Sequence, residues 1–232
     1  MKVPALSVFF PAFNEEKNIG VTVTNALKIL PQIANDFEII VVNDGSTDKT
    51  AAVVQKTISK NSKVRLINHE KNLGYGAALA TGFYSAKFPQ IAFTDADGQF
   101  DFSQITKFLE KADSADLVIG FRKKRAEGII RTFNAEGWQV LNFLLFGLRV
   151  KDIDCGFKLI KKKVLERIPK LESAGATISA ELLLRAKRAG FKIIEVPINH
   201  YPRKQGRPTG ANLTVIAKAF FELSRLWLKL RL

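Results

Sequence analysis

The chain has 232 residues, of which 47% are hydrophobic and 25% charged, and this composition excludes a disordered chain. It is long enough for one large α/β domain or two small ones. The formal net charge of +14 indicates an anionic partner, such as nucleic acid, a lipid surface or a phosphorylated substrate.

Short apolar segments alternate with helical ones in the first half of the chain. The predicted strands cover residues 6–10, 37–42, 64–68, 91–93 and 116–121. The predicted helices run from about 14 to 33, from 47 to 60, from beyond 76 to about 86, and from 103 to 112. Pro11 is expected to end the first strand. Strands that alternate with helices in this way predict right-handed βαβ units and a largely parallel sheet.

The alternation weakens after residue 121. The pattern predicts an apolar helix over 128–148, a loop and short strand over 152–163, and a helix over 178–189. Residues 191–199 read as a strand, which Pro197 places at or near an edge of the sheet. Since no repeat or linker interrupts the chain, we expect one domain over 1–211 and a final amphipathic helix over 212–232.

Polar clusters follow four of the predicted segments, at 14–16, 43–48, 72–76 and 95–99. In open α/β sheets, ligands bind outside the carboxyl ends of the strands. Each cluster follows a strand end or leads into the next helix. The sequence therefore predicts a ligand site along this edge.

Asp95, Asp97 and Gln99 follow the fourth predicted strand. The two carboxylates are two residues apart, so on an extended backbone they point the same way. Carboxylate and amide oxygens without cysteine or histidine suit a hard cation, Mg²⁺ or Mn²⁺, that shares its shell with substrate phosphates. An ordinary polar loop is the alternative, and an Asp-x-Asp pattern alone does not decide between them.

A nucleotide base has candidate partners at the first two strand ends. Phe13 offers a ring for stacking, and Glu15 and Asp44 offer carboxylates that accept from base N–H groups. The Gly74-Tyr75-Gly76 motif lacks the third glycine of a dinucleotide fingerprint, and the chain has no Walker A sequence. These observations argue against a dinucleotide oxidoreductase and a P-loop enzyme.

Several motifs together resemble family-2 glycosyltransferases of the GT-A (Rossmann-like) fold. They are PAFNEE at 11–16, VVNDGSTDKT at 41–50, NLGYGAALATG at 72–82, DADGQF at 95–100 and GFR at 120–122. The segments DCGFKLIKKKVL at 154–165 and AELLLRAKRAGFKIIEVPINHYPR at 180–203 narrow the resemblance to the dolichol-phosphate mannose synthase group, enzymes that glycosylate a polyprenyl phosphate. The resemblance covers nearly the whole chain, and it implies an α/β fold with a mixed, mostly parallel sheet flanked by helices.

The resemblance implies a role for each matching residue. The nucleotide would be contacted by Pro11, Phe13, Glu15, Asp44 and Gly74. The metal and the diphosphate would be bound by Asp95, Asp97 and Gln99. Phosphate oxygens would be met by Arg122 and Arg203, and the sugar pocket would be lined by Asp154, Gly156 and Phe157.

The chain departs from the usual family pattern at four positions: Phe13 for Tyr, Asn43 for Asp, Cys155 for Ser and Lys158 for Arg. The first three changes are mild. The last weakens the expectation of a bidentate phosphate contact at that position.

The resemblance implies an inverting transfer of a hexosyl group from a nucleotide-sugar, GDP-mannose or a UDP-sugar, to dolichyl or undecaprenyl phosphate. A lipid phosphate is already an anion and needs cationic residues rather than a base. A saccharide hydroxyl, the alternative acceptor in cell-envelope polysaccharide synthesis, needs a carboxylate base, for which Asp152 and Asp154 are candidates. A basic nucleic-acid-binding module is the alternative from another class, but no helix-turn-helix, zinc or stacking motif favours a nucleic-acid partner.

The final helix indicates contact with an anionic membrane surface. Apolar residues recur at helical spacing, and Trp227 has basic neighbours, which is typical of interfacial helices. The single cysteine, Cys155, fits a reducing compartment, and neither a signal peptide nor a run of about 18 apolar residues is present. We therefore expect a cytoplasmic protein, peripheral on the inner face of the membrane. A separate membrane-spanning protein is a conjectured partner.

Overall fold

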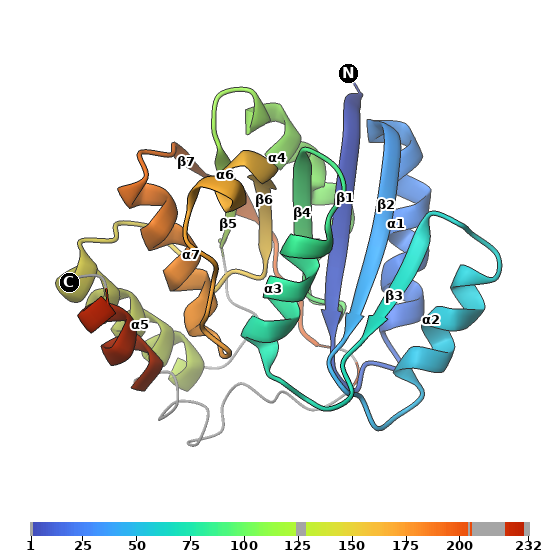
Figure 1. Cartoon of the computed structure of the whole chain (residues 1–232), viewed down its shortest axis with the longest axis horizontal. Helices are drawn as coiled ribbons and strands as arrows, with labels where there is room; N and C mark the ends of the chain where they lie inside the picture. Colours follow the sequence, from blue (N-terminus) through green and yellow to red (C-terminus); the bar gives the residue numbers. More distant parts are fainter. Residues whose placement is uncertain (1, 124–128, 204, 206–220, 230–232) are drawn as a thin grey trace.

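The structure is a computed structural model that describes residues 2–123, 129–203, 205 and 221–229, with side chains at all of these except 129–136. The described strands form one seven-stranded sheet in the order β3-β2-β1-β4-β6-β5-β7 (Figure 1). The strands are β1 (Val3–Ala12), β2 (Ala34–Asn43), β3 (Val64–Asn68), β4 (Gln90–Thr94), β5 (Leu117–Arg122), β6 (Phe157–Lys161) and β7 (Ile193–Ile198).

Of the described strands, β6 runs antiparallel to its neighbours β4 and β5, and the other pairs are parallel. The mixed, mostly parallel sheet is therefore confirmed. β7 is an edge strand, as Pro197 predicts.

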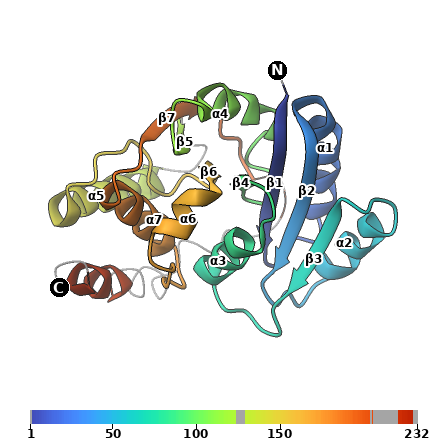
Figure 2. The ribbon, with the colours of Figure 1, turned by 45° about the horizontal axis from the view of Figure 1, so that its top comes forward.

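Helices cover both faces of the sheet. They are α1 (Ile19–Ile33), α2 (Thr50–Ile58), α3 (Tyr75–Ser85), the 3₁₀ turn η1 (Phe102–Gln104), α4 (Ile105–Ala112), α5 (Ile129–Phe146), α6 (Lys162–Arg167) and α7 (Thr177–Arg188). Residues of α1, α2 and α4 pack in one buried cluster, and residues of α3, α6 and α7 pack in another. Figure 2 shows α1 and α3 on opposite sides of the central strands.

The central strands are apolar on both faces because both faces are covered by helices. In β1, Val8 and Phe10 belong to the cluster with α1, while Phe9 points to the α3 side. Phe9 stacks on Phe93 with ring centroids 5.2 Å apart, and Phe83 of α3 meets both rings edge-on. This packing fixes the relative heights of β1 and β4, whose carboxyl ends hold the candidate site.

Several predicted boundaries were wrong: β1 begins at Val3 and β2 at Ala34, each earlier than predicted, and α2 covers only Thr50–Ile58. Two further differences have a local cause. β1 continues through Pro11 to Ala12, because its pairing with β4 ends at Phe9 and the missing proline N–H is tolerated where only β2 is a neighbour. α1 begins at Ile19, several residues later than predicted, since residues 14–16 are held by the loop after β2 instead of entering the helix. Helix α6 was not predicted.

The final helix is described over residues 221–229, which confirms that part of the prediction, whereas 212–220 and 230–232 lie outside the described residues. Leu223 and Leu226 are buried, and Leu226 joins the cluster of α3 and α7. Phe221 and Leu228 are exposed. Among the described helices, none combines the length and apolar character that crossing a bilayer requires.

Candidate active site

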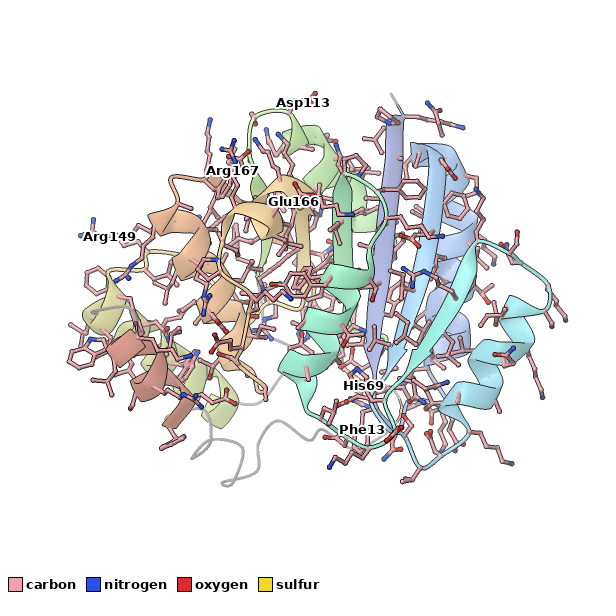
Figure 3. All side chains as sticks on the ribbon, viewed as in Figure 1. Phe13, His69, Asp113, Arg149, Glu166 and Arg167 are labelled. Carbon is pink, nitrogen blue, oxygen red and sulfur yellow. The ribbon has the colours of Figure 1, made fainter. Side chains whose placement is uncertain are left out.

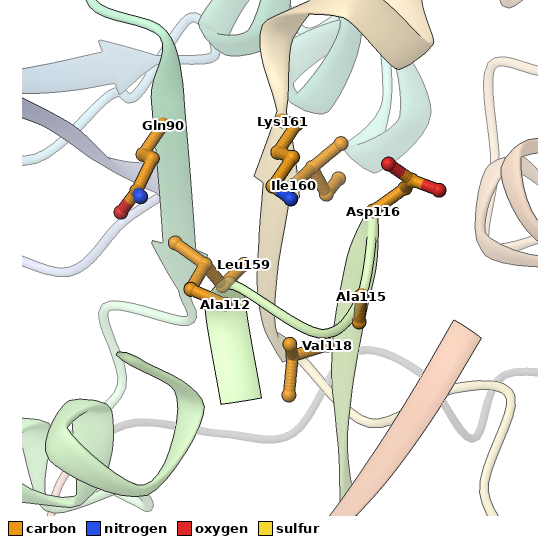
Figure 4. A pocket seen from close by; sticks show the side chains of 8 residues that line it. All are labelled: Gln90, Ala112, Ala115, Asp116, Val118, Leu159, Ile160 and Lys161. Atoms are coloured by element: carbon orange, nitrogen blue, oxygen red, sulfur yellow. The ribbon is translucent and has the colours of Figure 1, made fainter. Parts of the chain in front are cut away.

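The predicted site residues gather at the carboxyl ends of the parallel strands. Figure 3 shows Phe13 and His69 at this end of the sheet, and Asp113, Glu166 and Arg167 at the opposite end. A small pocket at that opposite end is lined by Gln90, Asp116 and Lys161 among others (Figure 4). It contains none of the predicted site residues.

The loops after β1 and β2 are bound to each other. The Asn14 backbone N–H donates to Ser46 Oγ (2.9 Å), and the Thr47 N–H donates to Asn14 Oδ1 (2.9 Å). The Glu15 N–H donates to Thr50 Oγ1 (2.8 Å). Asn14 has a φ of 56°, a conformation that asparagine tolerates better than most residues. These contacts fix the loop that carries Phe13, whose ring is 37% exposed and available for stacking.

Asp44 anchors the loop before α3. Its Oδ1 accepts from the Leu73 N–H and its Oδ2 from the Gly74 N–H, both at 2.9 Å. His69 Nδ1 lies 2.7 Å from the same Oδ1. Neither His69 nor this anchoring role of Asp44 was predicted from the sequence, and the predicted contact of Asp44 with a base stays a prediction.

Pro11 is buried inside β1. Its predicted contact with the nucleotide stays a prediction. Gly74 has a φ of 102°, and a Cβ there would lie 2.6 Å from the Ala174 carbonyl oxygen. Both constraints require glycine at position 74, and the structure explains this residue by packing.

Asp95 is held tightly just beyond β4. Its Oδ1 accepts from the Tyr75 hydroxyl (2.9 Å), and its backbone N–H donates to the Gly156 carbonyl (3.1 Å). A Cβ at Gly156 would lie 2.0 Å from Asp95 Oδ2, so the carboxylate fills the space a side chain would need. Burial raises the pKa of Asp95 to about 7, and the negative charge of Asp97 adds to the effect.

Arg203 lies between two carboxylates from distant parts of the chain. Its Nη2 is 2.5 Å from Glu15 Oε1, and its Nη1 is 3.5 Å from Asp97 Oδ2. Burial raises the pKa of Glu15, against the opposing effects of Asn18 and Arg203. The structure thus brings together three predicted residues, one from each of the loops after β1, β4 and β7.

Gln99 lies beside Asp97. The Gln99 backbone N–H donates to Asp97 Oδ1 (3.0 Å), and its side-chain amide nitrogen donates to the Tyr201 carbonyl (3.2 Å). The second bond ties the loop after β4 to the segment that carries Arg203. The role of Gln99 as a metal ligand stays a prediction.

Arg122 and Asp152 form a buried ion pair. Arg122 Nε and Nη2 donate to Asp152 Oδ2 (2.6 Å) and Oδ1 (2.8 Å), and the two side chains are 8% and 4% exposed. This bidentate contact occupies Nε and Nη2 of Arg122, which form the edge of the guanidinium that could otherwise bind a phosphate in the same way. It also engages Asp152, one of the two candidate bases.

Lys158 is 1% exposed and donates from Nζ to the Cys155 carbonyl (2.5 Å). Burial lowers its pKa, while the negative charges of Asp154, Asp152 and Asp95 oppose that effect. Lys158 therefore lies buried behind the carboxylates of the site. Its burial agrees with the weakened expectation of a bidentate phosphate contact at this position. Asp154, half-buried, lies at the same strand edge as Asp95.

The acidic residues fit a divalent cation that is shared with a substrate. Among the described residues, no group of three or more His, Cys, Asp or Glu side chains forms a complete metal cage. Asp95 and Asp97 together offer two carboxylates at one point of the sheet edge. Mg²⁺ and Mn²⁺ are commonly held by one or two carboxylates, with water and phosphate oxygens completing the shell.

Comparison with known proteins places the chain in a family. Residues 7–169 match the model of Glycosyl transferase family 2. The chain belongs to this family, which confirms the predicted class of enzyme, a glycosyltransferase.

Several proteins of the family are similar along most of the chain. A dolichyl-phosphate beta-glucosyltransferase of Saccharomyces cerevisiae is 32% identical over 221 residues, which covers 84% of this chain and 66% of that protein. The chain thus spans just under two thirds of the yeast protein. An uncharacterized protein of Methanocaldococcus jannaschii is 31% identical over 227 residues and covers 93% of this chain and 89% of its own length.

A solved structure shares the fold. Glucosyl-3-phosphoglycerate synthase from Mycobacterium tuberculosis, in complex with Mn²⁺, uridine diphosphate and phosphoglyceric acid, superposes with a TM-score of 0.72. The match covers 96% of this chain and 78% of that one, at 22% sequence identity. It confirms the GT-A-like architecture.

Proposed function

We propose that the chain transfers a hexosyl group from a nucleotide-sugar to a polyprenyl phosphate, with inversion and with the help of Mg²⁺ or Mn²⁺. The single observation that carries the proposal is the cluster of Asp95, Asp97, Glu15 and Arg203, which lie beyond the carboxyl ends of β1, β4 and β7. The names of the similar dolichyl-phosphate glucosyltransferases support the acceptor class, and the Mn²⁺ complex of the structural neighbour supports the metal.

Each residue of the site is assigned a role that suits its charge or its ring. Asp95 and Asp97 would hold the cation, which when bound supplies positive charge to the departing diphosphate. Arg203 is close enough to Asp97 to add a guanidinium at the same point. Phe13 offers a partly exposed ring for the base.

The acceptor follows from the state of the candidate bases. A hydroxyl acceptor needs a carboxylate to take its proton, but Asp152 is already bound by the Arg122 guanidinium through both oxygens. A phosphate acceptor is an anion and needs no such base. The engagement of Asp152 leaves Asp154 as the other candidate base for a saccharide hydroxyl, and this reduced choice of bases supports a phosphate acceptor.

A membrane surface is the proposed location of the reaction. Val140, Phe143 and Leu144 of α5 are exposed, and so are Phe221 and Leu228 of the final helix. Both helices lie at the end of the molecule away from α2 (Figure 1). Exposed apolar residues on amphipathic helices favour insertion into the interface of a bilayer. We further propose that residues 1–211 form one catalytic domain and that 212–232 form the helix that seats it on lipid.

The proposal is tested with labelled UDP-glucose and GDP-mannose, vesicles that contain polyprenyl phosphate, and either Mg²⁺ or Mn²⁺. We expect a chloroform-extractable labelled lipid from one of the donors, lost in chelator and in Asp97→Asn. Glu166→Gln, on the opposite end of the sheet, is the control and should keep full activity. Transfer to a free sugar but never to the lipid would refute the acceptor, and full activity in chelator would refute the metal.

A further inference from the structure

The loop over residues 171–175 lies between the final helix and the start of α3. On one side, both oxygens of Glu222 accept from the Gly175 N–H, at 3.1 and 3.2 Å. Lys229, further along the same helix, forms an ion pair with Glu172. The final helix therefore holds the loop at both ends.

On the other side, the loop fits closely against the first turn of α3. The Gly76 N–H donates to the Ala174 carbonyl at 2.6 Å. A Cβ at Gly76 would lie 2.2 Å from the Ser173 carbonyl oxygen, and one at Gly74 would lie 2.6 Å from that of Ala174. Backbone therefore packs on backbone with no side chain between, so the loop and the first turn of α3 must move together.

A third contact pins the loop to the core. Glu181 of α7, buried and paired with Arg185 at 2.6 Å, accepts from the N–H groups of Glu172 and Ser173. A buried carboxylate that meets two backbone donors and a guanidinium is expected to be rigid. Because the loop is rigid, a displacement of the final helix is expected to displace the start of α3 as well.

Tyr75 is the residue of α3 that faces the metal-binding end. It lies between Gly74 and Gly76, and its hydroxyl donates to Asp95 Oδ1 at 2.9 Å. The ring packs against the buried cluster shared by α3 and α7, which limits its rotation. A small shift of the first turn of α3 would therefore change the orientation of the Asp95 carboxylate.

We propose that the final helix positions Asp95 through this loop. When the helix is seated, that is, bound to the loop through Glu222 and Lys229, it favours binding of the divalent cation. Glu222 and Tyr75 are positioning residues at the two ends of the connection, and the proposal rests on the assignment of Asp95 to the metal. By thermodynamic linkage, a membrane that stabilises the seated helix would raise cation affinity, and the cation would in turn stabilise the seated helix.

The test measures Mn²⁺ affinity from the loss of the free Mn²⁺ electron paramagnetic resonance signal, with Mn²⁺ alone and with Mn²⁺ plus UDP. We expect Tyr75→Phe and Glu222→Ala each to weaken Mn²⁺ binding by about three- to tenfold, which corresponds to the net contribution of one typical hydrogen bond. Glu222→Gln keeps one acceptor oxygen and should fall between Glu222→Ala and the unmodified protein. Glu166→Gln, an exposed glutamate of α6, is the matched control and should bind like the unmodified protein.

A double-variant cycle separates this connection from two local effects. If Glu222 acts through Tyr75, Tyr75→Phe combined with Glu222→Ala should bind Mn²⁺ within about twofold of Tyr75→Phe alone. Effects that multiply, or a Glu222→Ala variant that binds Mn²⁺ normally while Asp95→Asn does not, would overturn the connection and leave the metal site standing. Mn²⁺ binding unaffected by Asp95→Asn would overturn both. Circular dichroism checks folding, and Glu222→Gln decides the matter if Glu222→Ala does not fold.

Discussion

Replacement of Asp95 by asparagine should stabilise the metal-free protein above neutral pH. Burial raises the pKa of Asp95 from 3.8 to about 7, so the folded protein holds this proton more tightly than the unfolded chain. The stability that Asp95 contributes in its protonated form is complete below about pH 4 and is lost as the pH rises through 7. The full difference corresponds to about 4 kcal/mol, and we expect about half of it because solvent partly screens a carboxylate at a strand end.

Asparagine keeps an oxygen that accepts from the Tyr75 hydroxyl and carries no charge. At pH 8 in chelator, Asp95→Asn should therefore raise the free energy of unfolding by about 2 kcal/mol, or the Tm by about 4–8 °C. At pH 4 the two proteins should unfold alike. Urea denaturation at pH 4, 6 and 8 measures this difference. A variant that is destabilised at pH 8, or whose gain does not depend on pH, would refute the reasoning.

Three other changes test the site. Gly156→Ala would place a Cβ 2.0 Å from Asp95 Oδ2; it should reduce transfer at least about 100-fold, measured with labelled donor, while a normal rate would show that the carboxylate can move aside. Phe13→Ala should raise the KM for the nucleotide-sugar about tenfold with little change in kcat, because a stacked base contributes about 1–3 kcal/mol; an unchanged KM would remove the ring from the donor site. Asp152→Asn should lower the free energy of unfolding by about 3 kcal/mol in urea, because it leaves the buried Arg122 without its charged partner, and a loss under 1 kcal/mol would contradict that.

Local pattern was sufficient for most of the fold. The strand over Val64–Asn68 was predicted to the residue, although only Val64 in it is buried. The strand before Asp95 was predicted to within one residue at each end, because a buried central strand is a continuous apolar run bounded by polar loops. The same reasoning failed for the start of α1. There the residues 14–16 have helix-forming neighbours but bond to a loop more than thirty positions away.

The candidate site was predictable in its charges and not in its contacts. The sequence shows that Asp95 and Asp97 follow a strand, which is a local property. It does not show that Gly156 must lack a side chain, or that Tyr75 donates to Asp95, because both facts depend on segments twenty or more positions away. Arg122 shows the same limit, since its bidentate partner Asp152 is 30 residues further along the chain.

The reversed direction of β6 has a consequence for how the two halves of such an enzyme can diverge. Because β5 and β6 are antiparallel, β5 ends and β6 begins at the same end of the sheet. The chain leaves the sheet at Arg122 and returns near Asp152, and the ion pair between these two side chains joins the two ends of the intervening segment. The segment between them contains α5 and contributes Leu148 to the buried cluster of α3 and α7, but none of its described residues forms a strand of the sheet. A change of length there would leave the loops after β1 and β4, which carry the candidate site, on their present scaffold.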